Sequence, residues 1–242
     1  MTRSAPYQPF LLRILHGGSG ILAIGAIISG FLVYNTFDGR FGKIPLTKID
    51  PIQDIHGTLG LFFLISLPVF ALYSLYAGQK RLLQPDSLQK LTQVGKPIWW
   101  VSWQRLANTF MLFASVLAVI SGRMMKEEWL PLGELNHIWY SVHLIAWVVM
   151  ICSLAIHILL SAKLGGGMLL LSIVNWRFRP EDSPTRWYGR LSMWINNFKA
   201  NWHVEINQWI QRTWYLKIIE ILVLGGIFIA FILPLFFSGD ES

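Results

Sequence analysis

Five long apolar stretches constrain the fold of this chain more than any other feature. They cover residues 10–34, 54–77, 104–122, 137–162 and 216–237. An apolar run of about 18 residues or more forms a helix long enough to cross the ~30 Å hydrocarbon core of a bilayer. We therefore expect five transmembrane helices rather than a soluble domain. The first stretch is too long for a secretory signal, and no small-residue cleavage site follows it, so we expect a retained helix.

The basic residues indicate how these helices are oriented. The chain has 20 Lys and Arg residues and a net charge of +7. If the N-terminus is cytoplasmic, most of the basic residues, including Arg3, fall on the inner side. The outer side then holds only Arg40, Lys43, Lys48, Arg123 and Lys126. By the positive-inside rule, this bias predicts a cytoplasmic N-terminus and a C-terminus on the opposite side. It also favours anionic lipid, not nucleic acid, as the partner of the basic charge.

The segment 176–215 has a different pattern from the rest of the chain. It follows KLGGGM, which predicts a flexible glycine hinge, and Asp182-Ser183-Pro184 resembles a capped helix start. Apolar residues then recur at steps of three and four: Trp187, Leu191, Trp194, Phe198, Trp202, Ile206, Trp209 and Ile210. Basic residues surround this stripe: Arg186, Arg190, Lys199 and Arg212. We expect an amphipathic helix on the inner leaflet, with docking onto a partner subunit as the alternative.

Histidines inside the apolar stretches are the strongest functional signal, because an ionisable group in a membrane helix is costly. Four of the six histidines lie there: His16, His56, His143 and His157. The other two, His137 and His203, are at interfacial positions. His143 and His157 are 14 residues apart, which places them ~40° apart around a helix and ~21 Å apart along it. One of them therefore lies near the outer surface and the other near the inner surface.

The four membrane histidines match in depth as two pairs. His16 and His157 both lie near the inner ends of their helices, whereas His56 and His143 both lie near the outer ends. Two neutral imidazoles on opposite sides of one metal ion are what a six-coordinate b-type haem requires. Small residues near the pairs would leave room for a flat macrocycle: Gly17, Gly18, Gly20, Gly57 and Gly60.

Haem propionates also need basic partners at the membrane surface. Arg13 and Lys163 are candidates for the inner haem, and Arg40, Lys43 or Arg123 for the outer one. Two alternatives keep the histidines without haem: structural hydrogen bonding between helices, or a proton relay. Zinc or copper fits less well, because such sites gather three or four ligands in one place. Cys152 is the single cysteine, so no C-x-x-C-H motif for covalent haem is present, and we expect it to be buried.

These residues resemble the prokaryotic di-haem cytochrome b561 superfamily, which includes b-type cytochrome subunits of nickel-iron hydrogenases and gamma subunits of formate dehydrogenases. The family pattern Arg-x-x-His reads RILH here, from Arg13 to His16. The other matching segments are HGTLG from His56, WQRLAN at 103–108, Ser121-Gly122, and the pair His143 and His157 with ILLSA after it. The resemblance covers about residues 8–163. The chain departs from the family pattern at Gly17, where an aromatic residue is common, and in its C-terminal extension.

The resemblance implies two non-covalent haems b with bis-histidine ligation, and usually exchange of electrons with a quinone. In relatives with a mapped quinone pocket, an Asn early in the third helix contributes near the inner haem. Asn108, one turn from Arg105, occupies that position, so both are implied as quinone contacts. We thus expect an all-α integral membrane protein of a prokaryotic plasma or thylakoid membrane. A four-helix transmembrane bundle with two haems spans 8–163, a cytoplasmic-side interfacial segment 164–215, and a fifth transmembrane helix 216–237.

The expected function is electron transfer across the membrane, to or from a quinone pool.

 We expect either an electron-transfer subunit of a partner dehydrogenase or a stand-alone oxidoreductase that acts on a small outer substrate such as superoxide. The sequence has no nicotinamide or flavin motif, so any dehydrogenase must be another chain. Two other classes stay open: a haem-binding scaffold or assembly factor, and a transporter with histidine proton relays. The transporter would bind no haem, and the paired broken helices of such folds are lacking.

Overall fold

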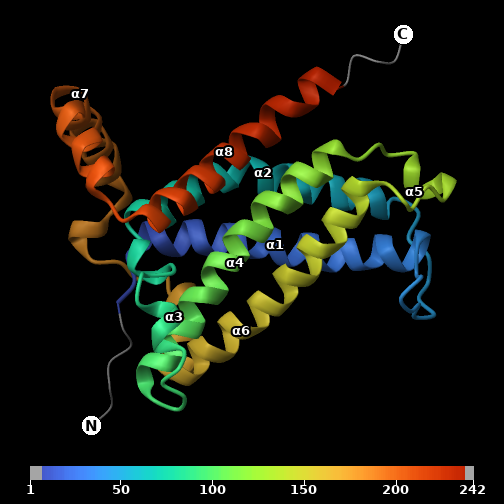
Figure 1. Ribbon diagram of the computed structural model, residues 1–242, viewed down its shortest axis with the longest axis horizontal. Coiled ribbons are helices and arrows are strands. Elements are labelled where there is room, and N and C mark those ends of the chain that lie inside the picture. Colours follow the sequence, from blue (N-terminus) through green and yellow to red (C-terminus); the bar gives the residue numbers. More distant parts are fainter. Residues whose placement is uncertain (1–6, 238–242) are drawn as a thin grey trace.

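The computed structural model describes residues 7–237, which form helices and loops without strands (Figure 1). Arg3 lies outside the described residues. Five helices are long and apolar enough to cross a membrane, as predicted: α1 (Phe10–Phe37), α2 (Ile52–Tyr76), α4 (Pro97–Met124), α6 (Ile138–Val174) and α8 (Trp214–Phe237). The other elements are η1 (Gln79–Arg81), α3 (Ser87–Lys90), α5 (Trp129–Leu132), η2 (Pro180–Asp182), η3 (Pro184–Arg186) and α7 (Trp187–Gln211).

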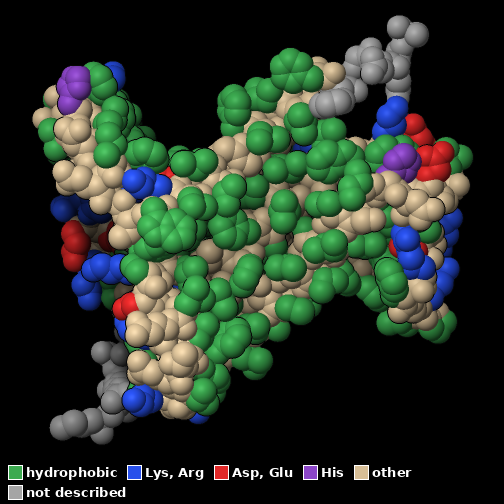
Figure 2. All heavy atoms as spheres, in the orientation of Figure 1, with side chains coloured by type: hydrophobic (Ala, Val, Ile, Leu, Met, Phe, Trp, Pro, Cys, Tyr) green, Lys and Arg blue, Asp and Glu red, His purple; other side chains and the backbone are tan. Residues whose placement is uncertain are grey.

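The five long helices alternate in direction. One end of the bundle therefore gathers the starts of α1, α4 and α8 and the ends of α2 and α6. We call this the inner end, following the orientation that the charge bias predicts, and the opposite end the outer end. Hydrophobic side chains cover the middle of the bundle, whereas charged side chains gather at its two ends (Figure 2). Ile21 and Phe228, which are 73% and 65% exposed, belong to this hydrophobic surface. We call this exposed apolar surface around the middle of the bundle the lipid-facing belt, because it suits contact with lipid.

Close helix packing holds the bundle together. The most extensive contacts join α4 to α6 and α1 to α2, and α8 packs on α4 and α2. Gly226 of α8 lies so near α4 that a Cβ atom there would fall 2.3 Å from Cγ1 of Val116. Small residues of this kind let membrane helices approach closely and gain van der Waals contact. The fifth helix is therefore a packed member of the bundle.

A kink at a glycine divides the fourth predicted helix. We expected the transmembrane helix to end near residue 162, with a glycine hinge after it. In the structure, α6 consists of two helical stretches that meet at Gly166 (φ 64°, ψ −171°), and the second stretch runs to Val174. The kink lies within the segment KLGGGM, where the hinge was expected. Cys152, which we expected to be buried, is exposed on this helix. The sequence pattern did not reveal which side of α6 faces the lipid.

Asp182 has a different partner from the one its sequence context predicted. Its carboxylate accepts hydrogen bonds from the backbone amide of Phe10 and the hydroxyl of Tyr7, both at 2.6 Å. Phe10 is the first residue of α1, so Asp182 caps the positive N-terminal end of that helix and not the start of α7. Its contact with α7 is an ion pair, with Nη1 of Arg190 at 3.9 Å. Burial alone would raise the pKa of Asp182. The two hydrogen bonds and the nearby Arg190 and Arg13 outweigh it and lower the pKa below its usual value.

Replacing Asp182 tests this contact between the start of α1 and the segment before α7. We expect Asp182→Asn to lower stability near pH 7 by about 1–3 kcal/mol, because the variant loses a charged hydrogen-bond acceptor. Since the native pKa is lowered, the stabilisation is present above about pH 4 and is lost as the pH falls through the native pKa. Thermal unfolding in detergent should therefore show parent and variant converging on acidification. Glu181→Gln is the control, because that carboxylate is exposed. An equal loss in both variants would contradict the assignment.

Candidate functional site

The structure brings the four membrane histidines together in two pairs. The rings of His16 (α1) and His157 (α6) have centroids 5.9 Å apart near the inner end. The rings of His56 (α2) and His143 (α6) have centroids 5.9 Å apart near the outer end. Two imidazoles on opposite sides of one metal ion hold their centroids about 6 Å apart, since each metal–nitrogen bond is about 2 Å long. Each pair is therefore spaced to ligate one metal ion between its rings.

A hydrogen bond from α4 orients the ring of His143. The hydroxyl of Ser121 donates to the carbonyl of Leu117 at 2.6 Å and lies 3.0 Å from Nδ1 of His143. A hydroxyl has a single proton, so Ser121 must accept the hydrogen bond from the imidazole. The proton of the ring then sits on Nδ1, and the lone pair of Nε2 is available to a metal.

Two further rings are held in the same way. The hydroxyl of Ser29 on α1 donates to a carbonyl one turn earlier at 2.8 Å and lies 3.0 Å from Nδ1 of His56. On α4, Oδ1 of Asn108 lies 2.7 Å from Nδ1 of His157, while the amide nitrogen of Asn108 donates to the carbonyl of Arg81 at 2.9 Å. Both contacts again leave Nε2 as the free metal ligand. Asn108, predicted as a quinone contact, thus directly positions an inner imidazole.

The outer pair borders a cavity of about 490 Å³, within the ~300–1,000 Å³ typical of cofactor sites. Glycines form part of its wall. A Cβ atom at Gly30 or Gly122 would lie 3.1 Å or 3.3 Å from Cε1 of the adjacent histidine, so a larger residue would press on the ring. At Gly57 and Gly60, a Cβ atom would meet nothing within 4 Å. These two positions leave open space of the kind that a flat macrocycle fills.

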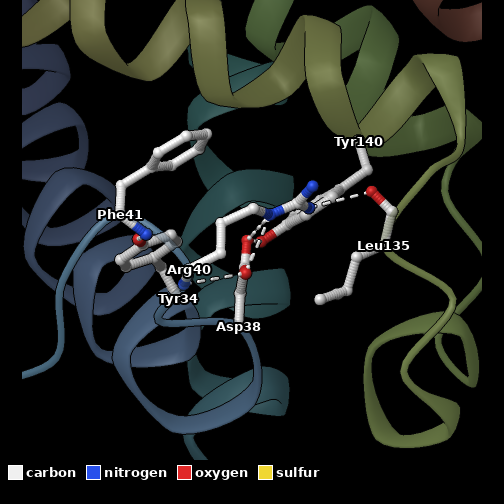
Figure 3. A network of polar contacts seen from close by, with 6 residues as sticks. All are labelled: Tyr34, Asp38, Arg40, Phe41, Leu135 and Tyr140. Atoms are coloured by element: carbon white, nitrogen blue, oxygen red, sulfur yellow. Dashed lines mark hydrogen bonds and ion pairs between the residues drawn. The ribbon is translucent and has the colours of Figure 1, made fainter.

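A polar network spans the outer end of the molecule (Figure 3). The buried carboxylate of Asp38 accepts hydrogen bonds from Nε of Arg40 at 2.9 Å and from the hydroxyl of Tyr140 at 2.7 Å. Arg40 also donates to the carbonyl of Leu135 at 2.9 Å. The network therefore joins the loop after α1 to the start of α6.

This network borders the mouth of the outer cavity. Tyr34 and Tyr140 line the cavity, and the hydroxyl of Tyr34 accepts a hydrogen bond from the amide of Phe41 at 2.6 Å. Of the basic residues predicted to serve the outer haem, Arg123 lines the cavity, whereas Arg40 is engaged with Asp38. Arg123 is thus better placed to meet a propionate.

Buried nitrogen donors lie on α1 and α4 toward the inner end of the bundle. Arg13 is 5% exposed, and its Nη1 donates to the carbonyls of Asn175 and Arg177. Nε and Nη2 of Arg13, and Nε1 of Trp103, are buried without a hydrogen-bond partner in the part of the chain that the structure describes. Unpaired buried donors are costly, so these groups fit an anion such as a haem propionate. A Cβ atom at Gly17, Gly18 or Gly20 would meet nothing within 4 Å.

The remaining candidate residues lie outside the two pairs. Nε of Arg105 donates to a backbone carbonyl of η1 at 3.1 Å. Nζ of Lys163 lies 5.6 Å from the ring centre of Trp100. His137 and His203 each lie against a neighbouring Trp ring, with centroids 3.8 Å and 3.4 Å apart.

Sequence reasoning missed two contributors to the site, Ser29 and Gly30. Both are small residues within an apolar stretch, and neither has a motif around it. Their roles depend on the position of α2, which brings His56 against them. A small polar residue at the depth of a membrane histidine on another helix is the only sequence signal that points to Ser29.

These features define a membrane-embedded helix bundle with two internal pairs of histidines. Residues 7–176 match the family described as prokaryotic cytochrome b561, and the chain belongs to that family. The family is a four-helix haem-binding membrane bundle and implies b-type haem and transmembrane electron transfer. The match covers α1, α2, α4 and α6 and ends before α7. No curated protein and no solved structure matches the chain.

Ser121→Ala tests the proton position on His143. Without its acceptor, the imidazole donates less electron density to a bound iron, so we expect the midpoint potential of the outer haem to rise. We also expect the affinity for that haem to fall about 10–100-fold. Spectroelectrochemical titration and haem titration measure the two effects. Ser115→Ala is the matched control, because Ser115 is buried on the same helix and donates to the carbonyl of Met111. Equal shifts in both variants would contradict the assignment.

Proposed function

We propose that this protein transfers electrons across the membrane through two haems b. The inner haem would lie between His16 and His157, and the outer haem between His56 and His143. The observation that carries the proposal is the spacing of the two imidazole pairs, each with centroids 5.9 Å apart. Membership of the cytochrome b561 family supports b-type haem as the ligand.

The two haems, when bound, supply one-electron chemistry between ferrous and ferric iron. The residues around them have separate tasks. Ser29, Ser121 and Asn108 hold the ring protons of His56, His143 and His157 on Nδ1, so that Nε2 of each ring would be free to hold the iron. Arg13 and Trp103 offer buried N–H groups to propionates. The lipid-facing belt and the packed helices exclude water from the path between the two sites.

We further propose that the inner end exchanges electrons with a quinone pool near Asn108 and Arg105. Asn108 contacts the inner ligand His157, and Arg105 lies on the same helix about one turn away, which supports a site at the edge of the inner haem. With the N-terminus cytoplasmic, this end lies on the cytoplasmic side of a prokaryotic plasma or thylakoid membrane. The outer haem would then exchange electrons with a redox partner subunit or a small outer substrate.

Haem content of single-histidine variants tests the ligation. We expect about two haems per polypeptide in detergent-purified parent protein. His143→Ala should lose the outer haem and His157→Ala the inner haem, and the two variants should retain spectroscopically different haems. His137→Ala should keep both, because His137 lies against Trp129 outside the pairs. Loss of the same haem in both ligand variants, or no loss in either, would overturn the pairing.

A haem-binding scaffold or assembly factor is the second candidate function, because α7 and α8 extend beyond the matched family region. Stopped-flow reduction by a short-chain quinol separates the two functions. If the protein transfers electrons, we expect the quinol to reduce the haem rapidly. Arg105→Gln should slow this reduction about tenfold, because the quinone would lose one hydrogen bond from a charged group. Lys96→Gln, at the start of the same helix, is the control and should leave the rate unchanged. A scaffold predicts slow reduction in every variant.

A further inference from the structure

The helix α7 lies beyond the matched family region and packs little against the bundle. It begins at Trp187, after the match ends at residue 176, and none of its residues is buried. Large apolar side chains are exposed along its stripe: Leu191 55%, Trp194 61%, Phe198 46% and Ile210 57%. It lies at the inner end of the molecule and runs crosswise to α1 (Figure 1). An exposed apolar stripe of this size needs a partner.

Contacts at both ends of α7 hold it against the inner end of the bundle. At its start, the ring of Trp187 lies 5.8 Å from the ring of Phe10, the first residue of α1. At its end, Nε1 of Trp209 donates to Glu220 of α8 at 3.2 Å. Both Trp residues belong to the apolar stripe. α7 is kinked at Asn201 (φ −123°, ψ 23°), and these contacts hold its first and last turns at the level where the membrane helices α1 and α8 begin.

A buried cluster around Glu220 secures the second of these contacts. The carboxylate accepts hydrogen bonds from Tyr76 of α2 at 2.6 Å and from Arg212 at 3.2 Å, in addition to Trp209. Glu220 is 7% exposed, so its charge depends on these donors. Because the cluster joins α2, the end of α7 and α8, it sets the angle at which α7 leaves the bundle.

The charges along α7 suit an anionic surface. Arg186 and Lys199 are exposed and flank the stripe, whereas Arg190 and Arg212 are engaged with carboxylates within the chain. The helix has one acidic residue, Glu205. Basic residues beside a Trp-rich apolar stripe are typical of helices that lie in the headgroup region.

We infer that α7 docks by its apolar stripe onto phospholipid of the inner leaflet, where Arg186 and Lys199 meet anionic headgroups. Such helices bury their apolar face about 5–10 Å into the boundary between headgroups and acyl chains. The inference is independent of the proposed haem and quinone chemistry.

Site-directed spin labels on the full-length protein in lipid nanodiscs test this inference. In a Cys152→Ala background, Phe198→Cys labels the stripe, and Asn196→Cys labels a position ~160° away around the helix. We expect the label at 198 to be relaxed mainly by oxygen, which concentrates in the bilayer, and the label at 196 mainly by an aqueous nickel chelate. Leu191→Cys repeats the test on the stripe if Phe198→Cys does not fold. Equal aqueous exposure of both labels would overturn the inference.

A second experiment tests the contact of Arg186 and Lys199 with anionic headgroups. In nanodiscs that contain phosphatidylglycerol, Arg186→Gln with Lys199→Gln should reduce the oxygen-to-nickel accessibility ratio of the label at 198. In nanodiscs of phosphatidylcholine alone, the same pair of substitutions should change it little. An unchanged ratio in both lipids would overturn the role of anionic headgroups. A label at 198 that neither reagent reaches would show that protein covers the stripe, and would also overturn the inference.

Discussion

Four imidazoles held inside a hydrocarbon layer are the constraint on which the rest of this structure depends. Each neutral ring has one N–H group, and leaving it unpaired in an apolar interior costs about 1–3 kcal/mol. Ser121 and Asn108 on α4 accept hydrogen bonds from the N–H groups of the two histidines of α6. The two helices run in opposite directions, and almost the same number of residues separates the two acceptors as separates the two histidines. Their side-by-side packing therefore follows from the need to satisfy both rings.

The second requirement is space. Where a ring or another helix approaches closely, the chain has a glycine: Gly30 beside His56, Gly122 beside His143, and Gly226 against Val116. At five other glycines of α1 and α2, a Cβ atom would meet nothing within 4 Å, which leaves room for a macrocycle: Gly17, Gly18, Gly20, Gly57 and Gly60. The same residue type thus serves close contact at one position and a cavity at another, and only the neighbouring helix distinguishes the two.

The C-terminal region extends the bundle through a buried charge. Glu220 lies within the membrane helix α8, where an unpaired carboxylate would be very costly. Tyr76, Trp209 and Arg212 all donate to it, so one residue joins α2, α7 and α8. Asp182 has a comparable role at the start of α1. The two carboxylates hold the segment around α7 at the inner end of the bundle.

The five membrane helices, the amphipathic stripe and the depth of the four histidines were predictable from the sequence. Lipid imposes a constraint along the helix axis that hydropathy and residue spacing record directly. The helical stretch between the glycine hinge and Val174, the partner of Asp182, the exposure of Cys152 and the roles of Ser29 and Gly30 were not predictable in this way. Each depends on which helices are neighbours and on how each is rotated about its axis. Because side chains far apart in the chain decide that rotation through packing and hydrogen bonds, only the tertiary structure determined it.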